Sequence, residues 1–147
     1  MMWFSCLFSP ARIVSRWMSY HGATLGALAL SGQPRRRRDY LPLLPAFPHI
    51  PPVYCYRCPL GKTYPACAVA CARELEATVR LEGDESIAGF IAEPVLGSSG
   101  NGVSAPPEYF PILRAACDAF DLLLIVDEVI TGIGRTGRNF AIEHWGV

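Results

Sequence analysis

Apolar positions along the chain follow two spacings, and each spacing predicts a different kind of element. Residues 11–20 and 86–95 are rich in β-branched, aliphatic and aromatic side chains with few breakers, so both segments are predicted to be strands. Residues 122–126 (LLLIV) are continuously apolar, as in a strand that is buried on both faces of a parallel sheet.

Other segments carry apolar side chains at the three- and four-residue spacing of an amphipathic helix. Residues 66–83 form the first, and a segment started by Pro107 forms the second, since proline favours the first helical turn. The two apolar stripes consist of Cys67, Cys71, Leu75 and Val79, and of Phe110, Leu113, Cys117 and Phe120. Residues 22–32, rich in alanine and leucine, predict a shorter helix that Gly32 and Pro34 end.

Strand, helix and strand follow one another over residues 86–127, for which a right-handed βαβ unit is the natural topology. The fold class is therefore predicted to be α/β, with a mostly parallel sheet and flanking helices. Residues 33–65 hold most of the prolines and are predicted to be irregular, and residues 97–107 are predicted to be a loop. Glu93 and Asp127 stand at strand ends, where open α/β sheets bind ligands.

Composition narrows the function classes. The chain has 147 residues, of which 51% are hydrophobic and 18% charged, as in a globular domain without a membrane-spanning stretch. Its 13 basic and 13 acidic residues leave no net charge, so a nucleic-acid partner is not expected, and neither is a membrane. Residues 35–38, all arginine, are interpreted as a solvated charge cluster.

The six cysteines are interpreted as free thiols in a reducing compartment, since no convincing secretory signal precedes them. The cytoplasm is expected, with the mitochondrion as the alternative because no acidic residue precedes residue 39; residues 1–11 receive no structural assignment. Cys55 and Cys58, followed by Cys67 and Cys71, have some of the spacing of a four-thiolate zinc site. Structural thiols are favoured over zinc, and no metal is predicted.

Two nucleotide-binding interpretations compete for the third strand. In the first, Asp127 would hold magnesium and residues 56–63 (YRCPLGKT) would be a phosphate loop, but Tyr56 stands where a glycine is required and Pro59 lacks an N–H donor. This phosphate-loop interpretation is kept as a minor alternative. In the second, residues 132–137 (GIGRTG) would be a dinucleotide-binding turn, but they lie too far beyond the strand, so it is rejected.

A carboxylate at the end of a buried parallel strand can also pair with the cationic ring nitrogen of pyridoxal phosphate, which makes the ring a better electron sink. Residues 90–147, which include EPVLGSSGNG and DEVITGIGRTG, closely resemble the class III, pyridoxal-phosphate-dependent aminotransferases, and so do residues 19–32 (SYHGATLGALALSG). The resemblance covers most of residues 12–147. It implies that they form part of the cofactor-binding large domain of fold type I.

The resemblance also implies a place for five side chains at the cofactor. Asp127 would pair with the ring nitrogen, Tyr20 would stack on one face of the ring, and Val129 would cover the other face. Glu93 would lie near cofactor and substrate and shape the charge of the pocket. His21 would be either a pocket neighbour or a structural residue.

Other family features are missing from these residues. Family members carry a Schiff-base lysine downstream of Asp127 and a phosphate cradle upstream of Tyr20, and Ile130 replaces a glutamine that contacts the ring hydroxyl in many relatives. Lys62 lies too far upstream to be that lysine, so no catalytic residue is assigned. Two hypotheses follow.

The first hypothesis is a transaminase represented by an incomplete chain. It would move an amino group from an amino acid or amine donor to a 2-oxo acid acceptor, and the full-length protein would be a homodimer. The second hypothesis is a catalytically inactive remnant that at most binds a partner.

Overall fold

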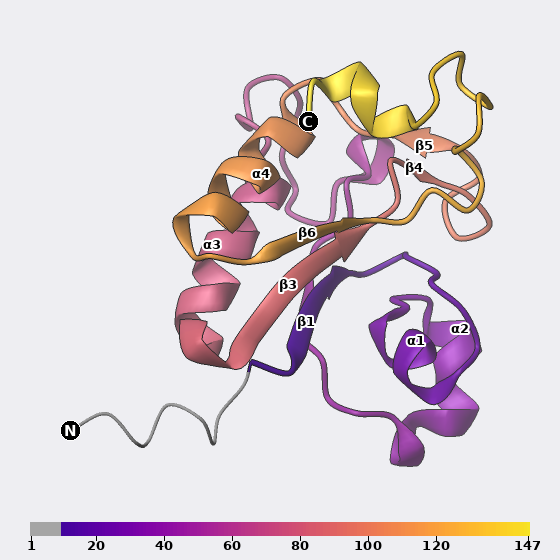
Figure 1. Cartoon of the computed structure of the whole chain (residues 1–147), viewed down its shortest axis with the longest axis vertical. Helices are drawn as coiled ribbons and strands as arrows, with labels where there is room; N and C mark the ends of the chain where they lie inside the picture. Colours follow the sequence, from indigo (N-terminus) through magenta and orange to yellow (C-terminus); the bar gives the residue numbers. More distant parts are fainter. Residues whose placement is uncertain (1–9) are drawn as a thin grey trace.

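The computed structural model describes residues 10–147; residues 1–9, which include most of the unassigned N-terminal segment, lie outside the described part. Its centre is a four-stranded sheet in the order β2-β1-β3-β6 (Figure 1). Every neighbouring pair of strands is parallel, which confirms an α/β fold built on a parallel sheet. The strands are β1 (Arg12–Arg16), β2 (His49–Ile50), β3 (Ile87–Ala92) and β6 (Leu123–Val126).

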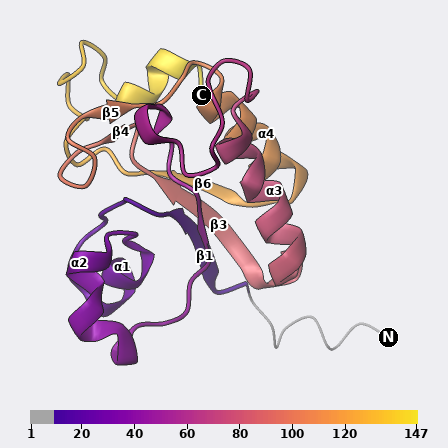
Figure 2. The same cartoon turned by 180° about the vertical axis from the view of Figure 1, so that it is seen from behind.

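Helices flank both sides of the sheet. α3 (Ala70–Glu82) and α4 (Tyr109–Ala119) pack together on one side, and α1 (Leu25–Leu30) and α2 (Pro34–Arg37) lie on the other (Figure 2). α4 connects β3 to its parallel neighbour β6, as predicted for the βαβ unit. Of the helices within residues 10–147, none is long and apolar enough to cross a membrane.

One hydrophobic cluster holds α3 and α4 on the sheet. Its fully buried members include Leu75 and Val79 of α3, Phe110 and Leu113 of α4, and Phe90 of β3. Each such side chain contributes about 1.5–3 kcal/mol when it leaves water. The cluster therefore fixes the strand ends relative to the helices, which is the condition for a rigid site at the sheet edge.

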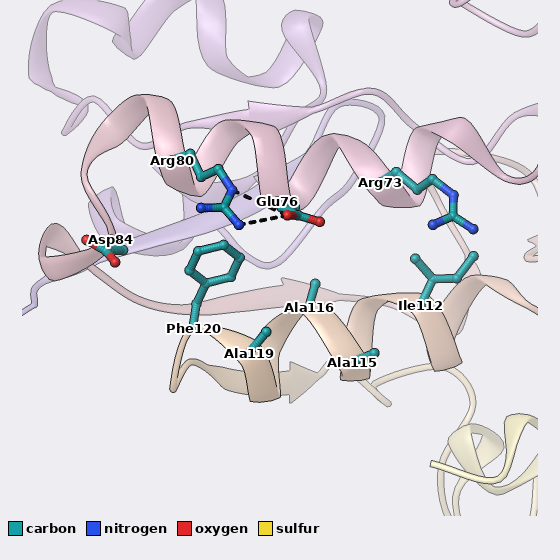
Figure 3. Close-up of a pocket in the computed structure, with 9 residues that line it drawn as sticks. All are labelled: Arg73, Glu76, Arg80, Asp84, Ile112, Ala115, Ala116, Ala119 and Phe120. Atoms are coloured by element: carbon teal, nitrogen blue, oxygen red, sulfur yellow. Dashed lines mark hydrogen bonds and ion pairs between the residues drawn. The ribbon is translucent and has the colours of Figure 1, made fainter.

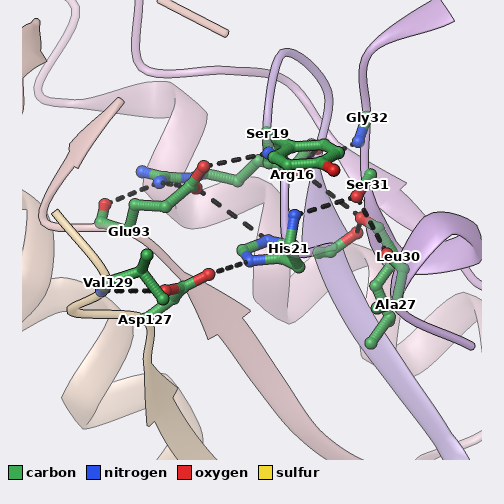
Figure 4. A network of polar contacts seen from close by, with 12 residues as sticks. Arg16, Ser19, His21, Ala27, Leu30, Ser31, Gly32, Glu93, Asp127 and Val129 are labelled. Carbon is green, nitrogen blue, oxygen red and sulfur yellow. Dashed lines mark hydrogen bonds and ion pairs between the residues drawn. The ribbon is translucent and has the colours of Figure 1, made fainter. Parts of the chain in front are cut away.

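β1 ends earlier than predicted, because the chain turns directly after Arg16. Met18 takes the left-handed conformation at φ 61°, and Gly32 packs against the turn. A Cβ on Gly32 would lie 2.1 Å from the carbonyl oxygen of Arg16, so only glycine allows this approach. The turn carries Tyr20 to the residue that follows β3, where its N–H donates to Glu93. It also carries His21 to Asp127, which follows β6, as Figure 4 shows.

The helices predicted in residues 22–32 and after Pro107 are confirmed as α1 and α4. α3 is also confirmed, but it starts later than predicted. Ala68 and Val69 take left-handed φ angles of 48° and 53°, which a helix cannot include. Cys67 therefore precedes α3, and its assignment to the apolar helical stripe is wrong.

Short elements occupy both segments that were predicted to lack regular structure. Residues 33–65 contain α2, β2 and two 3₁₀ helices, η1 (Arg38–Leu43) and η2 (Cys55–Arg57). The predicted loop at residues 97–107 contains β5 (Val103–Ser104), which pairs with β4 (Val95–Leu96) as an antiparallel hairpin. Strands of two residues show no readable alternation, so the sequence pattern does not reveal them.

The prediction that β6 is buried on both faces is wrong. Within residues 10–147, β6 is an edge strand whose one neighbour is β3. Leu123 is 67% exposed, and the rest of the strand is half-buried. An apolar run thus marks a strand correctly but does not report whether both of its sides are covered.

Candidate functional site

Three parallel strands end at the same edge of the sheet, and the residues that follow them form one polar network (Figure 4). Ala92 of β3 is in register with Val126 of β6, so the next residues, Glu93 and Asp127, lie beside each other. The turn after β1 adds His21 to the same edge. The sheet therefore brings together the two strand-end carboxylates that the sequence singled out.

The Asp127 carboxylate is held by two hydrogen bonds. Its Oδ2 lies 2.7 Å from Nδ1 of His21, and its Oδ1 accepts from the backbone N–H of Val129 at 3.2 Å. The hydrogen bond with His21 lowers the pKa of Asp127 below its usual value, although partial burial opposes this effect. Asp127 is therefore ionised at neutral pH, and Nδ1 of His21 is the donor. A carboxylate can accept about four hydrogen bonds, so Asp127 can still accept from a ligand.

His21 lies between the two carboxylates. Its side chain is 2% exposed, and its Nε2 lies 3.9 Å from Oε2 of Glu93. Among residues 10–147, Nε2 has no hydrogen-bond partner. The backbone N–H of His21 donates to Oγ of Ser31 at 2.9 Å, which anchors the turn to the end of α1. His21 is thus placed to orient Asp127 from behind.

Glu93 is bound by a fully buried arginine, Arg16, which is not among the site residues predicted from the sequence. Nη2 of Arg16 donates to the backbone oxygen and to Oε2 of Glu93, at 2.7 and 2.9 Å, and Oε1 accepts from the N–H of Tyr20. Burial lowers the pKa of Arg16, but Tyr109 and Glu93 raise it by more, so the guanidinium stays charged. The available signal was strand alternation, which places Arg16 on the same inward face as Val14.

A pocket of about 250 Å³ opens beside this network. It is lined by Tyr20, Glu93, Gly97, Ser98, Asp127, Val129 and Ile130. Four of the five side chains implied by the resemblance are in this lining, and the fifth, His21, contacts Asp127 from outside it. Val129 is 90% exposed, so its side chain stands free at the pocket rather than packed into the core.

The Tyr20 ring packs against one arginine of the run at residues 35–38. The Arg36 guanidinium carbon lies 4.0 Å from the ring centre, within the range of a cation–π contact. Arg37 is buried over Trp17, and its Nη1 lies 3.3 Å from Nε2 of His49. The interpretation of the whole run as solvated is therefore wrong for Arg37, because the neighbouring aromatic rings cover it.

The side chains that line this pocket fit a flat, cationic aromatic ring. The ionised Asp127 would face a ring nitrogen, while Tyr20, Val129 and Ile130 supply aromatic and branched apolar surface. A Cβ on Gly97 would lie 2.5 Å from Cδ1 of Ile130, so the absence of that atom gives Ile130 the space to line the pocket. These are the features that a protonated pyridine ring requires.

The phosphate-loop alternative is wrong. Such a loop leads into a helix whose first N–H groups bind the anion, but residues 61–63 (GKT) are followed by turns until α3 begins at Ala70. Lys62 lines a small cavity that shares no residue with the Asp127 pocket. In the part of the chain that the structure describes, no three His, Cys, Asp or Glu side chains are arranged to hold a metal ion.

The glycine run at residues 132–137 forms a turn-rich loop between β6 and the 3₁₀ helix η4 (Ala141–Trp145). Glu128 fastens this loop, because its carboxylate accepts from the Thr131 hydroxyl and from the N–H of Ile142, the latter at 2.9 Å. One Glu128 oxygen is therefore engaged by the loop and the other by η4. The second acid of the Asp-Glu pair has a structural position rather than a place in the pocket.

A larger groove of about 440 Å³ lies between α3 and α4, away from the strand ends (Figure 3). Arg80 donates to Oε1 of Glu76 at 3.0 Å, and its guanidinium carbon lies 4.8 Å from the Phe120 ring centre. These charges already have partners on the helices themselves. The groove offers size without the convergent polar groups of the smaller pocket.

Comparisons with known proteins identify the relatives of this chain. The family model for class-III aminotransferases matches residues 9–147. The uncharacterised aminotransferase YodT of Bacillus subtilis is 44% identical over 132 residues, covering 90% of this chain and 30% of that protein. The adenosylmethionine-8-amino-7-oxononanoate aminotransferase of Geobacter sulfurreducens is 39% identical over 140 residues, covering 93% and 30%.

Solved structures agree with these relatives. An amine transaminase from an uncultivated Pseudomonas species, in its PLP-bound form, superposes with a TM-score of 0.87 at 36% identity, covering 95% of this chain and 31% of that one. The chain spans about 30% of the length of the curated relatives that it matches.

Proposed function

The chain belongs to the class III aminotransferases, a family of pyridoxal-phosphate-dependent enzymes, and from this premise we propose that it forms the ring-nitrogen side of a transaminase cofactor pocket. The observation that carries the proposal is the ionised Asp127 carboxylate, oriented by His21 in a pocket that Tyr20 and Val129 line. The five side chains implied by the resemblance, of which Glu93 is one, are proposed as the cofactor-binding set.

Each of these side chains has a physical task in the proposal. When bound, pyridoxal phosphate supplies a ring that withdraws electrons from the substrate carbon. Asp127 would keep the ring nitrogen protonated, because a nearby carboxylate favours the charged form. His21 holds the Asp127 oxygen in place by donating from Nδ1. Tyr20 and Val129 would cover the two faces of the ring and exclude water from them.

Glu93 is proposed to shape the pocket through its own ion pair rather than as an exposed anion. Its Oε2 is bound by Arg16 and its Oε1 by the N–H of Tyr20, so the carboxylate also fixes the backbone that carries the stacking ring. Arg16 compensates the Glu93 charge. The remaining negative charge beside the pocket is that of Asp127, directed toward the proposed ring nitrogen.

For the whole protein we propose amino-group transfer from an amino acid or amine to a 2-oxo acid, by a homodimer in the cytoplasm. The family supports the reaction class. For these 147 residues alone we propose no turnover. Their single lysine, Lys62, lines a different cavity from Asp127, so no amine in the described pocket can anchor the cofactor covalently.

Pyridoxamine 5′-phosphate tests the ring-nitrogen site, since this amine form of the cofactor needs no lysine for binding. In ¹⁵N-labelled chain, the ligand should shift the His21 ring and Val129 amide signals, and Asp127→Asn should abolish both shifts. Asp118→Asn changes an exposed carboxylate that pairs with Arg114 and should leave the shifts unchanged. Shifts that persist undiminished in Asp127→Asn contradict the proposal.

A second measurement tests the absence of turnover. With pyridoxal 5′-phosphate, the chain should produce neither the visible absorbance of a lysine-bound cofactor nor amino transfer to pyruvate. Lys62→Ala should give the same result as the unmodified chain. A cofactor band that survives Lys62→Ala but disappears in Asp127→Asn would show that these residues hold the cofactor without the downstream lysine.

A further inference from the structure

Four of the six cysteines converge on one small cavity outside the cofactor pocket. Cys55 and Cys58 come from η2 and the residue after it, whereas Cys67 and Cys71 come from the turn before α3 and its first turn. The proposed transaminase chemistry does not use them. Their convergence therefore needs its own explanation.

The backbone at the start of α3 creates this cluster. If the helix began at residue 66, as the apolar stripe predicts, Cys67 would continue the helix surface. Instead, Ala68 and Val69 are left-handed, and the N–H of Cys67 donates to the oxygen of Thr63 at 2.9 Å. Cys67 therefore lines the same cavity as Cys55 and Cys58. It does not lie one helical turn before Cys71 on the surface of α3.

The four thiols are reachable and unlinked. Cys55 is exposed, and the other three are half-buried; all four are free. Burial raises the pKa of Cys55, and so do the neighbouring thiols Cys67 and Cys58. Burial also raises the pKa of Cys71, to about 11, and among the neighbouring thiols Cys55 contributes most to this increase. Of the four thiols, Cys55 is the one that is exposed. Cys117, in contrast, is buried in the core among apolar side chains.

Within residues 10–147, no three His, Cys, Asp or Glu side chains are grouped as ligands of a metal ion. Thiols that lie together and can be reached by small molecules have a second chemistry, the formation of a disulfide. Cys55 and Cys58 are separated by one 3₁₀ turn, a spacing at which side chains eclipse. Cys67 and Cys71 line the same cavity.

We propose that this cavity is an oxidative cross-linking site, at which a peroxide converts Cys55 and a second thiol of the cavity into an intramolecular disulfide. The Cys55 thiolate attacks one peroxide oxygen and forms a sulfenic acid, and the O–O bond breaks to release water. The second thiol then attacks the sulfenic sulfur and expels a second water. Two thiols are oxidised, and one hydrogen peroxide is reduced to two waters.

The proposal is independent of the proposed function, and it is tested on the chain without any cofactor. The reduced chain is treated with hydrogen peroxide at mildly alkaline pH, alkylated, digested and mapped by mass spectrometry. We expect the loss of two free thiols, an intramolecular link from Cys55 to Cys58, Cys67 or Cys71, and an unchanged Cys117. Circular dichroism before and after treatment checks that the fold is retained.

Single substitutions provide the matched comparison. Cys55→Ser removes the exposed thiol and should abolish the intramolecular link, whereas Cys58→Ser leaves Cys55 with two partners and should retain it. The proposal is overturned by links that are only intermolecular, by a link that survives in Cys55→Ser, or by thiols that all stay reduced. A stoichiometric zinc ion in the purified chain also overturns it, because the thiolates would then serve the metal.

Discussion

Arg16 is the residue whose position most needs a physical reason. A fully buried guanidinium is costly unless it is paired and hydrogen-bonded. One nitrogen, Nη2, satisfies both conditions through Glu93, whereas Nε and Nη1 have no hydrogen-bond partner among the described residues. The main effect of the pair is therefore on the geometry of the site and not on the stability of the fold. It fixes the positions of Glu93 and of the Tyr20 backbone.

Arg16→Met leaves the Glu93 carboxylate buried without its cation and should lower the free energy of unfolding by about 3–5 kcal/mol, the usual effect of removing one partner of a buried ion pair. Urea denaturation measures this loss.

Two comparison variants make the Arg16 result specific. Arg114→Met removes one partner of a surface pair, in which Arg114 is partly exposed and Asp118 is exposed, and should lower the free energy of unfolding by at most about 1 kcal/mol. The double variant Arg16→Met/Glu93→Gln should be more stable than Arg16→Met alone. A double variant that is less stable would mean that the lost packing of Arg16, and not the unpaired carboxylate, causes the damage.

The pKa of Asp127 is near 3.8 in the unfolded chain and lower in the folded chain. The ionised carboxylate therefore contributes its full stabilisation above about pH 3.8, and this contribution is lost as the pH falls through the folded-state pKa. Asp127→Asn should therefore flatten the acid side of the stability curve below about pH 4. The free energy of unfolding, measured in urea at a series of pH values, tests this. Parallel curves for both proteins would contradict it.

At the residue scale, the sequence predicted the acids of the site but not their partners. Glu93 and Asp127 were found because strand ends carry chemistry in α/β sheets. Arg16 was missed because an arginine inside a short strand has an ordinary interpretation as an exposed residue. Its burial depends on a carboxylate 77 positions away, which no local pattern reports.

At the element scale, the close contact between Gly32 and the turn after β1 determines whether Tyr20 and His21 reach the site. Gly32→Ala places a Cβ 2.4 Å from Cα of Trp17, which only a backbone shift can relieve. We predict a loss of about 1–3 kcal/mol in the free energy of unfolding.

Gly26→Ala is the matched control for Gly32→Ala. Gly26 lies in α1, and a Cβ there would have no atom within 4 Å, so this substitution should raise stability by about 0.5–1 kcal/mol. Denaturation curves of the two variants should shift in opposite directions. Equal shifts would contradict the close-contact argument.

The boundaries predicted from local sequence signals match the observed helix boundaries only where those signals agree with the tertiary packing. α1 and α4 were predicted because their apolar spacing and start or stop residues agree. α3 was placed too early because Cys67 continues its stripe in sequence, whereas left-handed Ala68 and Val69 delay the helix. Alanine and valine carry no sign of that conformation, so only tertiary structure reveals it.

At the scale of the whole molecule, β6 presents an open strand edge together with exposed apolar residues. Leu123 is 67% exposed on β6, and Val129 and Ile133 in the following loop are 90% and 98% exposed. Open edges of this kind pair with other chains. We predict that the isolated chain self-associates as its concentration rises, and that Leu123→Lys reduces this, as measured by sedimentation velocity.

Leu81→Lys is the control for the edge prediction. Leu81 is 86% exposed near the end of α3, so the substitution adds the same charge away from the β6 edge. It should leave self-association unchanged. Two results would contradict the assignment of β6 as the self-associating surface. One is a chain that remains monomeric at all concentrations, and the other is an equal reduction of self-association by Leu123→Lys and Leu81→Lys.

The strand order has a consequence for how the molecule is made. β1 is the first described strand to leave the ribosome. In the folded sheet it occupies an interior position, between β2 and β3. β2 then joins one side of β1, β3 joins the other, and β6 joins β3. Among the strands of residues 10–147, each new strand of this sheet extends a free edge, and none is inserted between strands that are already paired. The sheet can therefore grow outward during synthesis, and Asp127 reaches a His21 that is already in place.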